Sequence, residues 1–188
     1  MPSFKFTAIL GLAAAGYASI LPNTFQIPPN NHTWGCGQIN VFYTGFPAYH
    51  KMVIDQGYPP EEADGAIRNS TAEMVAAGYN VAMVLSGPEM DISLLANEMK
   101  GVDWHVTGIG FGMRGANNTE AVGRFEDNLM LFRQQGPMVP TVFNYNPWSF
   151  LWSVERYYPI GEDCTNNPGR LIQYTEICEE ACINPEDL

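Results

Sequence analysis

The chain is short of positive charge, and no long apolar run lies within it. Its 188 residues carry 9 lysines and arginines against 20 aspartates and glutamates, which gives a formal net charge of −11 with neutral histidines. Such a surface repels phosphate backbones and anionic lipid headgroups, so we expect neither nucleic acid nor a membrane surface as a partner. No stretch approaches the ~18 apolar residues of a membrane-spanning helix. The charge favours solubility or a cationic partner.

Several signals of catalysis are missing as well. Ser86 has no G-x-S-x-G sequence around it, which argues against nucleophilic hydrolysis of that type. The three histidines, His32, His50 and His105, are too scattered along the chain to predict a metal site. The sequence therefore predicts no specific reaction, and whether the protein is an enzyme stays open.

The N-terminus has the layout of a secretory signal peptide. Lys5 provides a positive start, residues 6–15 form a short apolar run, and Gly16 and Ala18 supply the small residues that signal peptidase reads. The alternative is a buried N-terminal helix. We expect cleavage after Ala18, so that residues 1–18 are a signal peptide and the remaining chain is secreted into the extracellular space.

An even number of cysteines in an exported chain predicts disulfides rather than zinc ligands or a catalytic thiol. The four cysteines are Cys36, Cys164, Cys178 and Cys182, and they allow three pairings. If residues 172–183 are helical, Cys178 and Cys182 lie one turn apart at a near-limiting separation, so longer-range partners are favoured. We expect the C-terminal segment to be tied to Cys36, with a last bridge closing within the tail.

Three Asn-X-Ser/Thr triplets begin at Asn31, Asn69 and Asn117. In a secreted chain such triplets are acceptors for N-glycosylation where they are exposed. The third lies beside a glycine-rich turn, and a glycan there would crowd the rim of that turn.

Apolar runs alternate with helical patterns between residues 39 and 158. The runs predict strands over 39–43, 80–86, 104–109 and 141–143. The helical patterns cover 59–78, 91–100, 119–135 and 148–158. The predicted buried stripe of the third helix consists of apolar residues at helical spacing, namely Val122, Phe125, Leu129 and Phe132.

This alternation predicts a three-layer α/β domain of the Rossmann-like or flavodoxin-like class. We expect a four-stranded parallel sheet in the order 2-1-3-4 over residues 39–158, with helices on both faces. Residues 19–38 are predicted to be an extended lead-in, because they are rich in proline and asparagine. Residues 159–188 are predicted to be a cysteine-containing tail tied to the domain by disulfides.

In such a sheet the ligand site lies at the carboxyl ends of the strands, where the strand order reverses. Thr44 and Gly45 follow the first predicted strand, and a glycine-rich turn that includes Gly110 and Gly112 follows the third. Glycines permit close backbone approach there. We therefore expect a crevice between these two turns.

Arg114 and Asn144 are the predicted polar contacts of that crevice. Arg114 is a bidentate donor suited to a carboxylate or phosphate, and Asn144 would orient a polar ligand. The glycine turn follows the third strand rather than the first, and no acidic residue stands where a dinucleotide ribose needs one. The alternative to an anion-binding site is a glycine turn with no ligand, followed by a surface arginine.

His50 is the only histidine at the predicted ligand edge, in the loop after the first strand. It is an outside candidate for proton transfer, as a general base, with an exposed loop histidine as the alternative.

A set of short fragments supports a relationship with known proteins. They are Gly108-Ile109-Gly110 with Arg114, Phe125-Glu126, Pro137, Phe143-Asn144 with Pro147, and Glu155-Arg156. In this order they resemble a group of small, uncharacterised microbial α/β proteins, often labelled Rossmann-like or NAD(P)-binding by fold analogy. The resemblance implies the fold and a pocket at Arg114 and Asn144. By the same analogy NAD(P) or a flavin is the implied cofactor, although soluble nicotinamide is scarce outside cells.

Two functions follow as expectations. The first is a secreted α/β protein that binds a small anionic or polar ligand at the carboxyl edge of its sheet, in a secreted metabolic pathway if it is an enzyme. The alternative is a non-catalytic extracellular interaction protein whose vestigial pocket is filled by aromatic side chains, such as those of Phe46, Phe111 or Trp148. Fold alone does not decide between them.

Overall fold

The computed structural model describes residues 33–183. It contains a five-stranded, wholly parallel sheet in the order β4-β3-β1-β2-β5. The strands are β1 (Asn40–Gly45), β2 (Asn80–Ser86), β3 (Val106–Ile109), β4 (Thr141–Phe143) and β5 (Leu171–Ile177). Every residue of β2 is buried, as expected for a central strand of a sheet that is covered on both faces.

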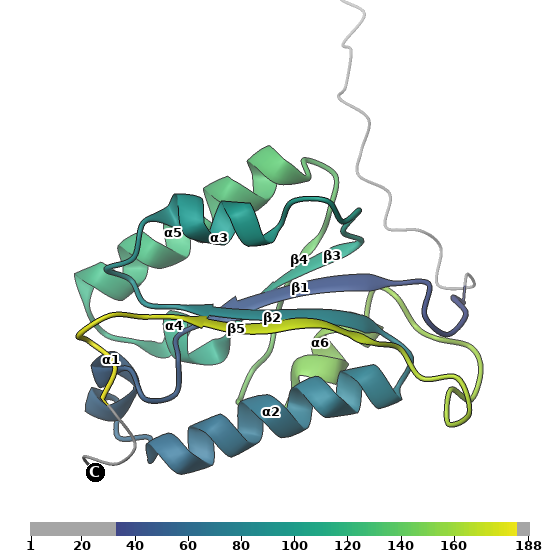
Figure 1. Ribbon diagram of the computed structural model, residues 1–188, viewed down its shortest axis with the longest axis horizontal. Coiled ribbons are helices and arrows are strands. Elements are labelled where there is room, and N and C mark those ends of the chain that lie inside the picture. Colours follow the sequence, from purple (N-terminus) through teal and green to yellow (C-terminus); the bar gives the residue numbers. More distant parts are fainter. Residues whose placement is uncertain (1–32, 184–188) are drawn as a thin grey trace, which may run out of the picture.

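Helices cover both faces of the sheet, as the alternating sequence predicts. They are α1 (Lys51–Asp55), α2 (Pro60–Ala76), α3 (Ile92–Glu98), α4 (Phe111–Gly115), α5 (Thr119–Gln135) and α6 (Phe150–Glu155). Figure 1 shows α3 and α5 on one face and α2 and α6 on the other, with α1 near the carboxyl ends of the strands. No helix within residues 33–183 has both the length and the apolar character needed to cross a bilayer.

The two faces of the sheet build two hydrophobic cores. Successive residues of a strand point to opposite faces, so Phe42 belongs to the core under α3 and α5, whereas Val41 and Tyr43 belong to the other core. Phe132 of α5 packs edge-to-face on Phe42, with the ring centroids 5.9 Å apart. Tyr43 stacks on Phe150 of α6 at 4.5 Å. Both cores thus meet at β1, the strand that carries the predicted site.

The prediction of four strands is wrong in one respect, because the tail supplies a fifth. The first four strands have the expected neighbours, but β5 pairs in parallel with β2 at the far edge. The sheet therefore extends beyond residue 158, where the predicted domain ended. The condition of a helix over 172–183 is not met, since Leu171–Ile177 is a strand in which Ile172, Thr175 and Ile177 are β-branched residues that favour this structure.

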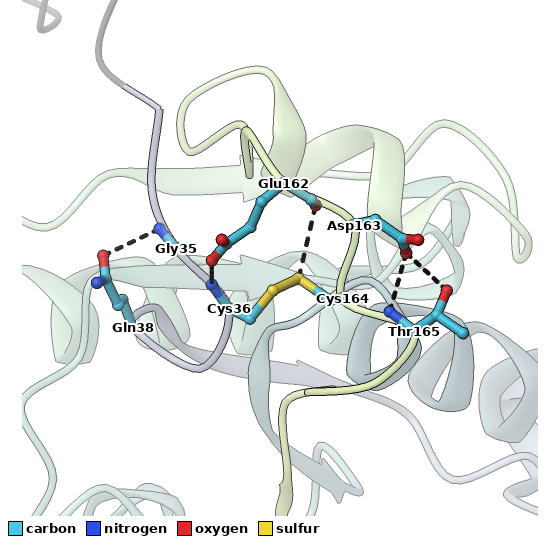
Figure 2. Close-up of a disulfide and its surroundings, with 7 residues drawn as sticks. All are labelled: Gly35, Cys36, Gln38, Glu162, Asp163, Cys164 and Thr165. Carbon is cyan, nitrogen blue, oxygen red and sulfur yellow. Dashed lines mark hydrogen bonds between the residues drawn. A yellow bond between two sulfur atoms is a disulfide. The ribbon is translucent and has the colours of Figure 1, made fainter.

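The disulfides join Cys36 to Cys164 and Cys178 to Cys182. The first confirms that the tail is tied to Cys36, and Figure 2 shows the Cys36 N–H donating to the Glu162 carboxylate at 2.8 Å. The preference for longer-range partners of Cys178 is wrong. Because β5 ends at Ile177 and a turn follows it, Cys178 and Cys182 reach a Cα separation of 5.9 Å without a helix.

Some predicted features lie outside the described residues, namely the signal peptide over 1–18, most of the lead-in and the triplet at Asn31. The other two glycosylation acceptors are both exposed. Asn69 lies on α2 and Asn117 lies in the turn before α5. Glycosylation and secretion remain predictions.

Candidate functional site

A small cavity of about 70 Å³ lies at the carboxyl edge of the sheet, between the ends of β1 and β3. This is the point where the strand order reverses, as the sequence predicts. Five of the six predicted ligand residues line it, and these are Thr44, Gly45, Gly110, Gly112 and Asn144. Most of the remaining wall is apolar, with Phe46, Met83, Leu85, Phe111 and Phe150 among its residues.

Two glycines allow the strands to approach so closely. The Gly110 N–H donates to the Thr44 carbonyl at 2.7 Å, and a Cβ on Gly110 would lie 3.4 Å from that oxygen. A Cβ on Gly108 would lie 2.3 Å from the ring of Tyr43. Both glycines therefore serve the packing of β3 against β1.

Two oxygen atoms in residues of the cavity wall are buried without a hydrogen-bond partner among the described residues. They are Thr44 Oγ1 and Asn144 Oδ1, in side chains that are 0% and 1% exposed. Burying a polar atom without a partner costs about 1–3 kcal/mol in proteins. Because of this cost, we expect a buried oxygen of this kind to bind a water or ligand or to have another function.

Hydrogen bonds of its side chain and its main chain fix the position of Asn144. Its Nδ2 donates to the Asn146 carbonyl at 2.7 Å, and its main-chain N–H donates to the Tyr43 hydroxyl at 3.2 Å. The bond to Asn146 sets the orientation of the carboxamide, and Oδ1 is then left without a hydrogen-bond partner among the described residues. Burial raises the pKa of Tyr43 to about 12, which keeps that hydroxyl neutral at physiological pH.

Arg114 does not line the cavity. Its guanidinium donates through Nη2 to the main-chain oxygen of Asn144 and lies 5.1 Å from the ring centroid of Phe143. Desolvation lowers the pKa of Arg114, which is half-buried. The residue therefore holds the Asn144 backbone in place, and its charge faces a carbonyl rather than the cavity.

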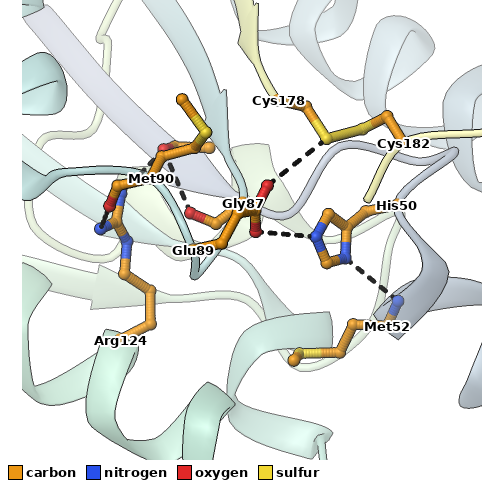
Figure 3. Close-up of polar contacts among 9 residues, drawn as sticks. His50, Met52, Gly87, Glu89, Met90, Arg124, Cys178 and Cys182 are labelled. Carbon is orange, nitrogen blue, oxygen red and sulfur yellow. Dashed lines mark hydrogen bonds and ion pairs between the residues drawn. A yellow bond between two sulfur atoms is a disulfide. The ribbon is translucent and has the colours of Figure 1, made fainter. Parts of the chain in front are cut away.

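His50 caps helix α1 and is 4% exposed, not the exposed loop residue of the alternative. As Figure 3 shows, its Nδ1 accepts from the Met52 N–H at 3.0 Å, and its Nε2 lies 3.0 Å from a Glu89 carboxylate oxygen. The first contact places the proton on Nε2, which donates to Glu89. Both ring nitrogens are thus engaged, and neither is free to act as a general base.

The carboxylate of Glu89 also lies close to a disulfide. Its second oxygen is 3.7 Å from Cys178 Sγ, so a histidine, a carboxylate and a sulfur cluster together. Cys178 is bonded to Cys182, which removes the thiolate that a metal ion would require. Main-chain hydrogen bonds hold the tail at this point, since the Lys51 N–H donates to the Ala181 carbonyl at 2.9 Å and the Ile183 N–H donates to the Tyr49 carbonyl at 3.0 Å.

Sequence reasoning missed Arg124, a buried cation on α5. It is 3% exposed and donates to the Met90 carbonyl at 2.8 Å and to Ser86 Oγ at 2.7 Å (Figure 3). These bonds hold the loop between β2 and α3, which carries Glu89. Desolvation lowers the pKa of Arg124.

The buried face of α5 also differs from the predicted stripe. Val122 is 50% exposed, whereas Arg124 and Asn128 are buried. The available signal was the helical spacing of these two residues with Ala121 and Leu131, which are buried on the same face.

A groove of about 800 Å³ lies beside the cavity. Tyr58 and Phe111 line both hollows and form the wall between them. The groove is more polar, and its other residues include His50, Lys51, Asp55, Gln56, Glu89, Asn117, Asn118 and Glu120.

Residues Gly110 to Gly115 have the glycine spacing G-x-G-x-x-G, after a strand and at the start of a helix. Here the helix is the five-residue α4, and Gly110 packs against β1. No family model matches the chain, and no curated protein or solved structure is significantly similar to it. The structure has a parallel α/β sheet and two disulfides, but none of these comparisons identifies a Rossmann-like or NAD(P)-binding relationship.

Proposed function

We propose that this is a secreted protein that binds a ligand through a small, neutral group with a hydrogen-bond donor, which enters the cavity between β1 and β3. The observation that carries the proposal is the pair of unpartnered oxygens, Thr44 Oγ1 and Asn144 Oδ1, in residues of the same cavity wall. A ligand N–H or O–H would satisfy Asn144, and Thr44 can donate or accept. The disulfides support an oxidising, extracellular compartment.

The size of the cavity limits the part of the ligand that enters it. One water needs roughly 10–15 Å³ of such volume, so 70 Å³ admits about five to seven water-sized groups. The apolar wall favours a compact hydrocarbon body beside the donor. Short branched alcohols and primary amides have this chemistry.

The charge of the group that enters the cavity follows from the protein groups that face it. Asn144 Oδ1 is an acceptor and repels a carboxylate or phosphate oxygen. Arg114, the expected anion receptor, already donates to the Asn144 carbonyl. Of the two expected ligand classes, anionic and polar, the arrangement therefore supports the polar one.

The cofactors implied by fold analogy fit less well. The three-ring flavin system exceeds a cavity of about 70 Å³, and Gly110 packs against Thr44 and Gly45 of β1, which occupy the space that a pyrophosphate would need there. In the groove, Lys51 is the only lysine or arginine among the described lining residues, and it is paired with Asp55 at 2.6 Å. We therefore assign no NAD(P) or flavin to the site.

The alternative of a pocket filled by aromatic side chains is supported less well than ligand binding. Trp148 is 62% exposed and stands outside the cavity wall. Phe46 and Phe111 do contribute to the wall, yet a hollow remains between them and the polar residues.

A matched pair of fragments tests the proposal. 2-Methylpropanamide and 2-methylpropanoate have the same shape, but the first is a neutral donor and the second an anion. In two-dimensional NMR titrations of the secreted chain, we expect saturable shifts of the amides of Thr44, Gly110 and Asn144 with the amide. A fragment of this size should bind with a Kd of roughly 1 mM. Equal binding of the anion, or no saturation with either fragment, would refute the proposal.

A further inference from the structure

The cavity and the groove together make a site with two compartments. Tyr58 and Phe111 are the residues common to both, so the groove and the cavity are adjacent. A cavity of about 70 Å³ is small for a ligand site, whereas the groove adds about 800 Å³. Ligand pockets usually measure about 300–1,000 Å³, so the two hollows together have the usual size.

We propose that the natural ligand is an amphipathic cation, with a neutral donor-bearing head in the cavity and a positively charged tail in the groove. This inference rests on the proposed function, because the head is the part that the cavity binds. It adds the charge and the location of the tail, for which the groove supplies the evidence.

The groove has an excess of negative charge. Three carboxylates, those of Asp55, Glu89 and Glu120, line it together with a single lysine, Lys51. Asp55 is neutralised by Lys51 at 2.6 Å, and Glu89 bonds His50 at 3.0 Å. Glu120 has no cationic partner among the described residues, and it is exposed to an incoming charge.

The N-terminus of α5, which borders the groove, does not reverse this preference. A helix N-terminus attracts anions through its free N–H groups. Here the Asn118 side chain accepts from the Ala121 N–H at 2.8 Å, and Glu120 occupies the first turn. Both features reduce the attraction for an anionic tail. With the whole chain at −11, the long-range field also favours a cation.

The boundary between the compartments consists of two aromatic side chains. Phe111 belongs to α4, and a Cβ on Gly115 would come within 3.4 Å of its ring. Gly115 thus lies beside the Phe111 ring, close enough for a Cβ to be in van der Waals contact with it. Tyr58 is only half-buried, in the connection between α1 and α2. A slim alkyl chain passing between two aromatic rings fits this boundary better than a bulky group does.

Three compounds with the same amide head and the same six-carbon chain test the inference. Hexanamide ends in methyl, 6-aminohexanamide in ammonium and 5-carbamoylpentanoate in carboxylate. Calorimetric titrations would use the secreted, enzymatically deglycosylated chain, since a glycan on Asn117 would obstruct the groove. We expect 6-aminohexanamide to bind at least tenfold more tightly than the carboxylate, with hexanamide between them. The difference should shrink as salt is raised.

Two substitutions on α5 locate the effect. Glu120→Gln should reduce the advantage of the ammonium compound several-fold and leave hexanamide binding unchanged. Glu126→Gln removes the same charge from an exposed position outside the groove and should leave the advantage nearly intact. If hexanamide binds but the three end groups bind equally, or if both variants act alike, the inference of a cationic tail is wrong and the proposed function stands. If none of the three binds, the proposed function fails with it.

Discussion

Replacing Thr44 by valine separates a binding role of its hydroxyl from a structural one. The side chain is fully buried, and Oγ1 has no partner among the described residues. Valine has nearly the same shape and no polar atom. Since an unsatisfied buried hydroxyl costs about 1–3 kcal/mol, Thr44→Val should raise the free energy of unfolding by about 1–2 kcal/mol. For a domain of this size that corresponds to a rise in Tm of roughly 2–8 °C.

Thr107→Val is the matched control in the neighbouring strand β3. Thr107 is 1% exposed, but its hydroxyl lies 2.9 Å from Thr141 Oγ1. Removing a satisfied hydroxyl should lower the free energy of unfolding by about 0.5–1.5 kcal/mol. The two variants thus make the same chemical change with opposite expected signs. Urea denaturation and calorimetry of both variants against wild type measure the difference.

Binding should change independently of stability. Thr44→Val should weaken 2-methylpropanamide although the protein is more stable, whereas Thr107→Val should bind it normally. A loss of stability in Thr44→Val comparable to that of Thr107→Val would show that the Thr44 hydroxyl has a partner in solution. Such a result would refute the proposal that the Thr44 hydroxyl is free to bind a ligand.

Three further predictions concern the surroundings of the site. In urea denaturation, Tyr174→Phe should leave the free energy of unfolding unchanged or raised, because the Tyr174 hydroxyl is buried without a partner among the described residues. Tyr43→Phe should lower it by about 1–3 kcal/mol, because the Asn144 N–H loses its acceptor. Folding raises the pKa of Tyr43 from 10.0 to about 12, so the stability that the neutral hydroxyl contributes is complete below pH 10 and is lost as pH rises towards 12. The difference in unfolding free energy between wild type and Tyr43→Phe should therefore shrink over that interval. A difference that grows would contradict the raised pKa of Tyr43. Gly108→Ala should cost about 1–3 kcal/mol in the same assay because its Cβ would overlap the Tyr43 ring, and wild-type stability would refute that contact.

The sequence predicts the central sheet well, because burial on both faces leaves a direct trace in the residues. The run Asn80–Ser86 is almost wholly apolar and corresponds to β2 from end to end. Strand β5 leaves a weaker trace. It is half-exposed at the sheet edge and contains Gln173 and Glu176, and the cysteines that follow it suggest a tail rather than a strand.

Helix α5 shows why a pattern of apolar residues misplaces a face. Arg124 and Asn128 are polar, and polar residues are expected outside. Arg124 is buried because the Met90 carbonyl and the Ser86 hydroxyl satisfy part of its guanidinium. Those partners lie more than thirty residues away in sequence and come together only in the folded chain. Sequence periodicity contains no information about them.

The same limit applies to the candidate site. Topology alone brings Thr44, Gly110 and Asn144 to one edge, since the ends of neighbouring parallel strands must meet there. The chemistry of their side chains made Arg114 the candidate for anion binding and His50 the candidate for proton transfer. The structure shows that both are engaged by local hydrogen bonds, Arg114 with a carbonyl and His50 through both nitrogens. Which polar groups remain free depends on these contacts.

The contacts that occupy Arg114 also explain why Asn144 is suited to bind. The Arg114 guanidinium takes the main-chain oxygen of Asn144, the Tyr43 hydroxyl takes its N–H, and the Asn146 carbonyl takes its amide hydrogen. The side-chain oxygen of Asn144 is therefore left without a hydrogen-bond partner among the described residues, and it is the acceptor that we propose for the ligand. Because these bonds exist before any ligand arrives, binding requires little ordering of the protein. On the proposed function the arginine is a positioning residue, and its replacement should weaken the binding of 2-methylpropanamide in the same NMR titration.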